Sequence, residues 1–345
     1  MQDELSREQT GLAGVWSVRS RLEAALATCW QAAIVHPALP NVPDLQGQIA
    51  LRRVDAPMGV VYSSAIAPRL AANLGIPTED LAIRLAERWP ASTADKADWA
   101  DSPLRVAQKH LVQVHLGDRL LAAWLQQFTR PAESQSPDLF PEPEPDLAIW
   151  KSALLTHVQP SPGQLQDRLL QDRLPQDRLP QDKLPQDRLP QDRLPQDKRF
   201  QDQWFEMQAA HARCCNLLAL AERVGLVRFE LPGAIEGELV WPMPMPWLTA
   251  EGTLRTQAPA EQRLIGHLLD SVDALGSIQH GSAIALAQSL SRCVYDFDAS
   301  CRIFGDVAVH QLELAQARLG LVRAAQQTLR WLLEGPLQVA APPSL

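Results

Sequence analysis

The sequence is poor in the residue clusters that metal sites and disulfide frameworks require. Only five of its 345 residues are cysteines, and no two of them have Cys-x-x-Cys spacing. An odd number of cysteines with irregular spacing argues against both kinds of site. We therefore expect no bound metal, and we expect buried free thiols in a reducing compartment.

Lysine is also scarce, because 27 of the 32 basic residues are arginines. The net charge of −8 argues against a protein that binds nucleic acid through charge alone, since such binding relies on many basic contacts to phosphates. Arginine suits planar, bidentate contacts to carboxylate or phosphate, although a GC-rich genome also favours arginine codons. A shaped site with a few well-placed arginines remains open.

Long apolar runs are missing as well. No stretch of 18 apolar residues occurs, so we expect no transmembrane helix and no membrane partner. The segment from Met1 to Thr10 is polar and acidic and lacks a basic stretch followed by an apolar run. We expect no signal peptide and a cytoplasmic location.

Residues 1–130 have the pattern of a small α+β domain. Apolar residues recur at helical spacing from Gly14 to Val35, and further helices are expected over residues 62–74, 78–89 and 119–128. Short strands are expected over residues 48–54 and 105–116, because the second range alternates apolar and polar residues. Gly75 fits a helix C-cap, and Thr78 after Pro77 fits an N-cap.

Residues 131–203 have the composition of a linker. The first part is rich in proline and acidic residues, with one short helical stretch over residues 146–157. A tandem repeat follows, in which eight five-residue units begin with Gln-Asp and five of them end in proline. A proline every fifth residue blocks a continuous helix, so we expect an extended spacer rather than a solenoid.

Residues 204–345 are expected to form an all-α helical bundle. Apolar positions at helical spacing predict helices from about Trp204 to Gly225 and over residues 260–275, 283–297 and 312–333. The segment between the first two contains Pro242, Pro244 and Pro246 in alternation and is not helical. The predicted fold is therefore mainly α, with a small α+β domain at the N-terminus.

Three segments of the C-terminal region resemble the DALR anticodon-binding domain of arginyl-tRNA synthetases. Residues 207–218 read MQAAHARCCNLL, similar to the family's Q-Y-A-H-A-R-x-C-S-I-L. Residues 295–303 read YDFDASCRI, similar to F-Y-D-A-C-R-V-L, and residues 318–329 read RLGLVRAAQQTL, similar to R-L-A-L-V-R-A-x-R-Q-V-L. The resemblance covers residues 204–345 and implies a bundle that binds a tRNA anticodon loop.

This resemblance supplies a set of candidate RNA-binding residues. They are Gln208, His211, Arg213, Asn216, Arg302, Arg318 and Arg323. His211 also fits an apolar helix face, and each arginine also fits a solvated or capping position. Trp241 and Trp247 bracket the proline-rich segment, where stacking on bases and packing on the bundle are both open.

The N-terminal region resembles the same synthetases' N-terminal domain, which touches the tRNA elbow in that family. Residues 59–65 (GVVYSSA) and 70–74 (LAANL) are similar to its G-D-Y-x-[ST]-N and L-A-K-x-L stretches, and residues 111–122 resemble its I-N-F-x-L-S-x-x-x-L-A segment. The usual Gly-Asp is Gly59-Val60 here, and the Ile-Asn-Phe core is missing.

The synthetase's catalytic motifs are missing from the sequence. None of the eight histidines lies in a His-x-Gly-His motif, and no lysine follows Lys198, so the Lys-Met-Ser-Lys-Ser-like loop is missing too. We therefore expect a protein that is not an enzyme, with no cofactor. Its expected partner is tRNA or another structured RNA, with a complete synthetase as a candidate protein partner. The alternative is a protein-interaction module that has lost RNA contact.

Overall fold

A computed structural model describes residues 15–34, 49–54, 59–89, 99–129, 194–231, 233, 237–274 and 280–345. The chain is mainly helical and includes a small antiparallel sheet, as the sequence predicts. The described residues up to 129 and those from 198 onward belong to one compact unit. The expected spacer from residue 131 to 193, including the helix over residues 146–157, lies outside the described residues.

The N-terminal part contains a four-stranded antiparallel sheet with the order β1-β2-β4-β3. Its strands are β1 (Leu51–Val54), β2 (Val61–Ser64), β3 (Leu104–Val106) and β4 (Val112–His115). The single strand expected over residues 105–116 is wrong, because the chain reverses direction there and forms β3 and β4 as a pair. Lys109 and His110 make this turn with positive φ angles of 59° and 58°.

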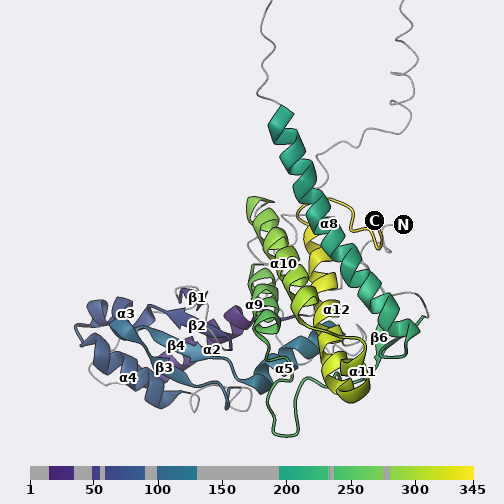
Figure 1. Cartoon of the computed structure of the whole chain (residues 1–345). Helices are drawn as coiled ribbons and strands as arrows, with labels where there is room; N and C mark the ends of the chain where they lie inside the picture. Colours follow the sequence, from purple (N-terminus) through teal and green to yellow (C-terminus); the bar gives the residue numbers. More distant parts are fainter. Residues whose placement is uncertain are drawn as a thin grey trace, which may run out of the picture. The chain divides into compact units, whose positions relative to one another are not determined.

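The described residues of the N-terminal part also form helices (Figure 1). They are α2 (Val18–Ile34), α3 (Ile66–Leu74), α4 (Thr78–Arg88) and α5 (Asp118–Gln126), with 3-10 turns at η2 (Gln108–His110) and η3 (Gln127–Thr129). Gly75 closes α3 in the left-handed conformation at φ 65°, as predicted. The expected cap at Thr78 is wrong by one residue, because Pro77 holds the N-cap position.

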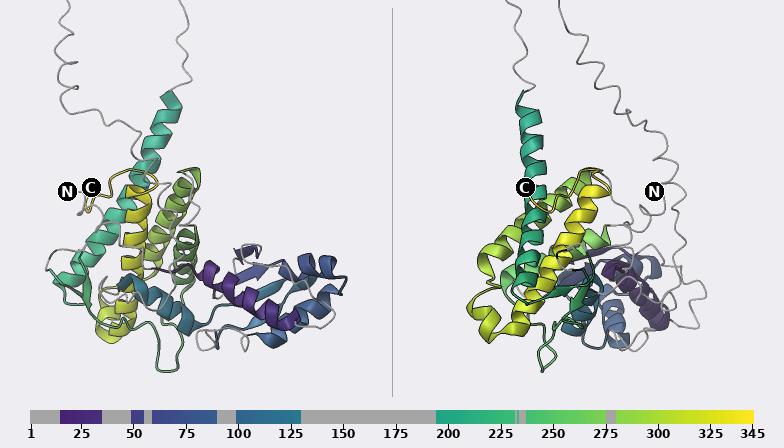
Figure 2. Two further views of the ribbon diagram at one scale, coloured as in Figure 1. Left: turned by 180° about the vertical axis from the view of Figure 1, so that it is seen from behind. Right: turned by 90° about the vertical axis from the view of Figure 1, so that its right-hand side faces the viewer.

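The C-terminal part is built on long helices (Figures 1 and 2). They are α8 (Leu194–Arg223), α9 (Pro259–Asp273), α10 (His280–Ser300) and α12 (Leu312–Glu334), with the short α11 (Asp306–His310) before α12. The expectation of a purely α-helical region is incomplete, because β5 (Arg228–Phe229) pairs with β6 (Leu239–Trp241). This pair lies in the segment whose prolines exclude a helix, and its strands are too short to show an alternating pattern.

The helix α8 begins within the range expected to be linker. The last proline of the repeat, Pro195, lies in the first turn of α8, where a proline is tolerated because its missing N–H has no helical partner. The two units after it, residues 196–205, end in phenylalanine instead of proline and contain no helix breaker. The helix α8 therefore begins about two repeat units before residue 203, where the linker was expected to end.

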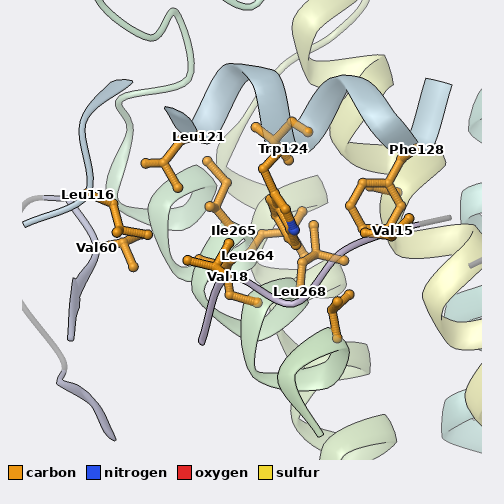
Figure 3. Packing of buried hydrophobic residues seen from close by; sticks show 14 of the residues in the cluster. Val15, Val18, Val60, Leu116, Leu121, Trp124, Phe128, Leu264, Ile265 and Leu268 are labelled. Carbon is orange, nitrogen blue, oxygen red and sulfur yellow. The ribbon is translucent and has the colours of Figure 1, made fainter. Parts of the chain in front are cut away.

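The hydrophobic core is continuous between the N-terminal and C-terminal parts of this unit. Trp124 of α5 is fully buried and lies among Val18 of α2 and Leu264 and Leu268 of α9 (Figure 3). Polar contacts cross the same boundary, since the guanidinium of Arg53 on β1 bonds the carboxylate of Asp270 on α9. The N-terminal and C-terminal parts of this unit therefore share one hydrophobic core.

Candidate functional site

The seven candidate RNA-binding residues lie on three stretches of the C-terminal part. Those stretches are α8, the chain that leaves α10, and α12. The structure brings three of the seven to one hollow, namely Arg213, Asn216 and Arg302. The other four, Gln208, His211, Arg318 and Arg323, make bonds that hold the bundle together.

The hollow has a volume of about 570 Å³ and lies between the second half of α8 and residues 298–304. Its α8 wall carries Arg213, Asn216, Leu220 and Arg223. These positions are spaced by three, four and three residues, so they share one face of the helix. Arg213, Asn216 and Arg223 are exposed, which leaves their polar groups within reach of a ligand.

On the opposite wall of the hollow, Arg302 lies between two buried residues. Cys301 and Ile303 are 3% and 4% exposed, whereas Arg302 between them is exposed. The carbonyl oxygen of Arg302 accepts a hydrogen bond from Nη1 of Arg318 at 2.5 Å. Arg318 therefore fixes the backbone at Arg302, and the exposed Arg302 lines the hollow.

Most arginines of the C-terminal part already have an anionic partner. Ion pairs with carboxylates involve Arg213, Arg255, Arg263, Arg292, Arg318 and Arg330. Within the described residues, Arg223, Arg228 and Arg302 have no such partner. Two of these three line the hollow, so positive charge without a counter-charge is concentrated there.

Arg213 differs from the other arginines of the hollow because it is paired. Its Nε lies 2.8 Å from Oδ2 of Asp298, and its Nη2 lies 3.3 Å from Oδ1 of the same residue. The hydrogen bond to Asp298 raises the pKa of the Arg213 guanidinium. The Arg213 side chain is nevertheless 48% exposed, and that of Asp298 is 25% exposed.

Gln208 and His211 hold the C-terminal segment instead of facing the hollow. The amide of Gln208 donates to the carbonyl oxygen of Ala340 at 2.8 Å. His211 is fully buried, and its Nδ1 lies 3.0 Å from the carbonyl oxygen of Pro342. Since that oxygen only accepts, Nδ1 carries the proton, and Nε2 accepts from the Gln326 amide at 3.0 Å. His211 was open to two interpretations, an RNA contact or a core residue, and in the structure it is a buried core residue.

Arg318 and Arg323 are also committed to the interior. Arg318 lies 2.6 Å from Glu261, a carboxylate that is 1% exposed and caps the start of α9. Arg323 is 5% exposed and donates to the carbonyl oxygen of Gly237 and to Gln326. Arg318 reaches the hollow only through the backbone of Arg302, and Arg323 does not line it.

The two tryptophans that bracket the proline-rich segment have different environments. Trp247 is 3% exposed and lies against Gly320 of α12, so it packs on the bundle. Trp241, on β6, is 39% exposed. Neither tryptophan lines the hollow.

Two charged residues of the hollow, Arg223 and Asp298, are not among the candidates that the sequence supplies. Arg223 lies ten residues after Arg213, and this spacing on a predicted helix places both on one face, so helical periodicity alone supplies the signal. Asp298 lies 85 residues from Arg213, and no local pattern indicates their contact. The partner of a long-range ion pair becomes visible only when the helices are packed.

A second hollow of about 590 Å³ lies at the start of α5 and has a different character. Its acidic residues, Asp101 and Asp118, accept hydrogen bonds from the backbone N–H groups of Arg119 and Leu254. These carboxylates therefore satisfy backbone donors at a helix start and at a loop, which is a structural use.

Comparison with known protein families, with curated proteins and with solved structures finds no match for this chain. In the described parts of the chain, no helix has both the length and the apolar character needed to cross a membrane. Groups of three or more histidine, cysteine, aspartate or glutamate side chains placed to hold a metal ion do not occur among the described residues either. The hollow beside α8 is the feature with the clearest binding chemistry.

Proposed function

We propose that this chain is a non-catalytic relative of arginyl-tRNA synthetase that binds a tRNA anticodon loop, or a similar RNA loop, in the hollow beside α8. The C-terminal bundle is then of the DALR type, and the N-terminal sheet and helices correspond to the domain that touches the tRNA elbow. The protein works in the cytoplasm, with tRNA or a complete synthetase as its partner. The proposal combines the sequence resemblance with the chemistry of the hollow.

The observation that carries the proposal is the pairing pattern of the arginines. Residues 199–345 contain 11 arginines, no lysine and 15 acidic residues, and among the described residues Arg213, Arg255, Arg263, Arg292, Arg318 and Arg330 pair with carboxylates. Arg223 and Arg302 are left without one in the described structure, and both line the same hollow beside Asn216. Guanidinium groups are well suited to phosphate, and an exposed amide suits the edges of unstacked bases.

The overall charge agrees with weak, shape-dependent binding. The net charge of −4 from Arg199 to Leu345 repels a polyanion at long range. A few phosphate contacts in one hollow support dissociation constants of about 1–100 µM, the range of non-specific binding at physiological salt. Selection of a particular RNA then comes from the shape of an unpaired loop and the edges of its bases.

A filter-binding assay with total tRNA at low salt tests this proposal. We expect R223Q and R302Q each to weaken binding by about three- to tenfold, because each removes one phosphate contact. R228Q is the matched control, since Arg228 has no carboxylate partner among the described residues and lies outside the hollow. Binding that is undetectable at tens of micromolar wild-type protein, or an equal loss in all three variants, contradicts the proposal.

The second candidate function is a protein-interaction module that has kept the bundle and lost RNA contact. The burial of His211 and the occupation of Gln208 by the C-terminal segment favour it, because two candidate RNA contacts are then used internally. A pull-down that returns a stable protein partner after nuclease treatment, together with no tRNA binding, supports this alternative.

A further inference from the structure

The hollow contains one acidic side chain whose position works against anion binding. Asp298 lines the hollow together with three arginines, and it pairs with one of them, Arg213, through two hydrogen bonds. Arg223 and Arg302 are left to attract an anion, while Arg213 is already neutralised. The carboxylate therefore removes about a third of the positive charge of the hollow.

The stability of α10 does not explain this carboxylate. Asp298 lies in the last turn of α10, a helix that ends at Ser300. Backbone carbonyl groups give a helix C-terminus a partial negative charge, so an acidic residue there is unfavourable. The α10 helix has no basic residue in its last turn to offset this effect. Arg213 of α8 is the group that neutralises Asp298.

The pair is also easy to exchange. Both partners are partly exposed, and exposed ion pairs contribute little to stability because water screens them and the side chains lose freedom. A phosphate offers Arg213 the same bidentate geometry as a carboxylate. The guanidinium is thus able to move from Asp298 to a phosphate at a small cost.

We infer that Asp298 is an affinity-limiting counter-charge, which holds Arg213 in the free protein and gives it up to a phosphate of the bound RNA. This inference rests on the proposed function, because the proposed ligand supplies the phosphate. Asp298 keeps the complex weak and readily reversible, since the negative charge stays beside the ligand after the exchange. Arg223 and Arg302 make the first contacts, and Arg213 follows.

The charge-neutralising variant D298N tests this inference directly. It frees Arg213 and removes a negative charge at about 4 Å from the bound phosphate, so we expect binding of total tRNA to strengthen about fivefold. The slope of log Kd against log salt should steepen by about 0.7, because in the wild type the Asp298 carboxylate takes up a cation when Arg213 leaves it for the phosphate, and in D298N it does not. Thermal unfolding checks that the variant folds as the wild type does.

The matched control is D296N, which changes the net charge of the chain by the same amount. Asp296 is two residues away, is 62% exposed, pairs with Arg263 and does not line the hollow. We expect D296N to change Kd less than twofold and to leave the salt slope unchanged. If D298N and D296N have the same affinity and slope, Asp298 is not a specific counter-charge and the inference is overturned.

A second measurement decides the inference even if tRNA is not the ligand. Heparin is a polyanion with no relation to RNA sequence, and elution from a heparin column reports the accessible positive charge of the whole protein, so the difference between D298N and D296N reports the contribution of the hollow. We expect D298N to elute at higher salt than D296N. If D298N elutes later but no variant binds tRNA, the proposed function is overturned, and the role of Asp298 as a counter-charge to Arg213 still stands. Identical elution of the two variants overturns the counter-charge itself.

Discussion

The hydroxyl of Tyr62 on β2 donates a hydrogen bond to Oδ2 of Asp273, the last residue of α9, although 211 positions separate the two residues in the sequence. The other carboxylate oxygen of Asp273 accepts from the hydroxyl of Ser17 and the backbone N–H of Arg19. The side chains of Tyr62 and Asp273 are both inaccessible to solvent. Three segments of the chain therefore meet at one buried carboxylate.

The first prediction concerns the strength of this contact. Y62F removes the hydroxyl and leaves the ring, so we expect the free energy of unfolding in urea to fall by about 1.5–3 kcal/mol, the range for a hydrogen bond to a charged group. Y295F is the matched control, because the Tyr295 hydroxyl bonds a carbonyl at 3.4 Å on an exposed surface. We expect Y295F to cost less than about 0.5 kcal/mol. Equal losses in the two variants contradict the assignment.

The second prediction is a pH dependence of the same contact. Burial, followed by the charge and hydrogen bond of Asp273, raises the pKa of Tyr62 above its ordinary value. A raised pKa gives stability that is complete below the unfolded value of about 10 and is lost as the pH rises above it. The difference in unfolding free energy between wild type and Y62F should therefore shrink by about 0.8 kcal/mol from pH 8 to pH 10.5. A constant difference over that range argues against a buried, protonated Tyr62.

The third prediction separates His211 from the proposed RNA site. H211A removes two hydrogen-bond partners and leaves a cavity in the bundle, so we expect a loss of about 2–4 kcal/mol in unfolding free energy. Binding of tRNA, measured well below the melting temperature, should change less than twofold. R302Q should behave in the opposite way, with weakened binding and nearly unchanged stability. A large loss of affinity in folded H211A restores the direct RNA role.

The fourth prediction concerns Arg318 as the support of the hollow. R318Q leaves the buried carboxylate of Glu261 without its ion pair and the Arg302 carbonyl without its donor. We expect a loss of about 3 kcal/mol, typical of breaking a buried ion pair. R263Q, which breaks the exposed Arg263–Asp296 pair, should cost less than about 0.5 kcal/mol. Urea unfolding of both variants checks the difference, and a mild R318Q contradicts it.

The fifth prediction tests the packing of Trp247. A Cβ atom at Gly320 would lie 2.5 Å from the Trp247 ring, so G320A should destabilise by about 1–3 kcal/mol through overpacking. Gly281 of α10 has open space at the same atom, and G281A should be neutral or stabilising by up to about 1 kcal/mol. Thermal unfolding distinguishes them. A neutral G320A shows that Trp247 moves freely and is open to other contacts.

Local patterns were sufficient for the long elements of the fold. The apolar spacing of α12 and the glycine after α3 depend on neighbouring residues alone, so both are visible in the sequence. The strand β2 was not predicted, because it has four residues and runs directly into α3. The pair β5 and β6 is shorter still, and its register depends on residues about ten positions apart.

The candidate site was predictable only in part, because its geometry also depends on contacts between residues far apart in the sequence. Arg213, Asn216 and Arg302 were identified through the resemblance, and the structure brings them together. The same motifs also contained His211 and Arg323, which are buried and bonded to other parts of the bundle. A motif indicates which residues matter and leaves open whether they act through a ligand or through packing. Only the three-dimensional contacts distinguish these two roles.

The continuous core around Trp124 has a consequence for the synthesis of this protein. Its partner Leu264 follows 140 residues later in the sequence, so a ribosome working at about 5–20 residues per second makes it roughly 7–28 s afterwards. During that interval the side of Trp124 that packs on α9 has no native cover. The nascent chain therefore depends on chaperones or on slow folding until α9 emerges, and substitutions in α9 should reduce yield in cells more than their effect on the finished protein suggests.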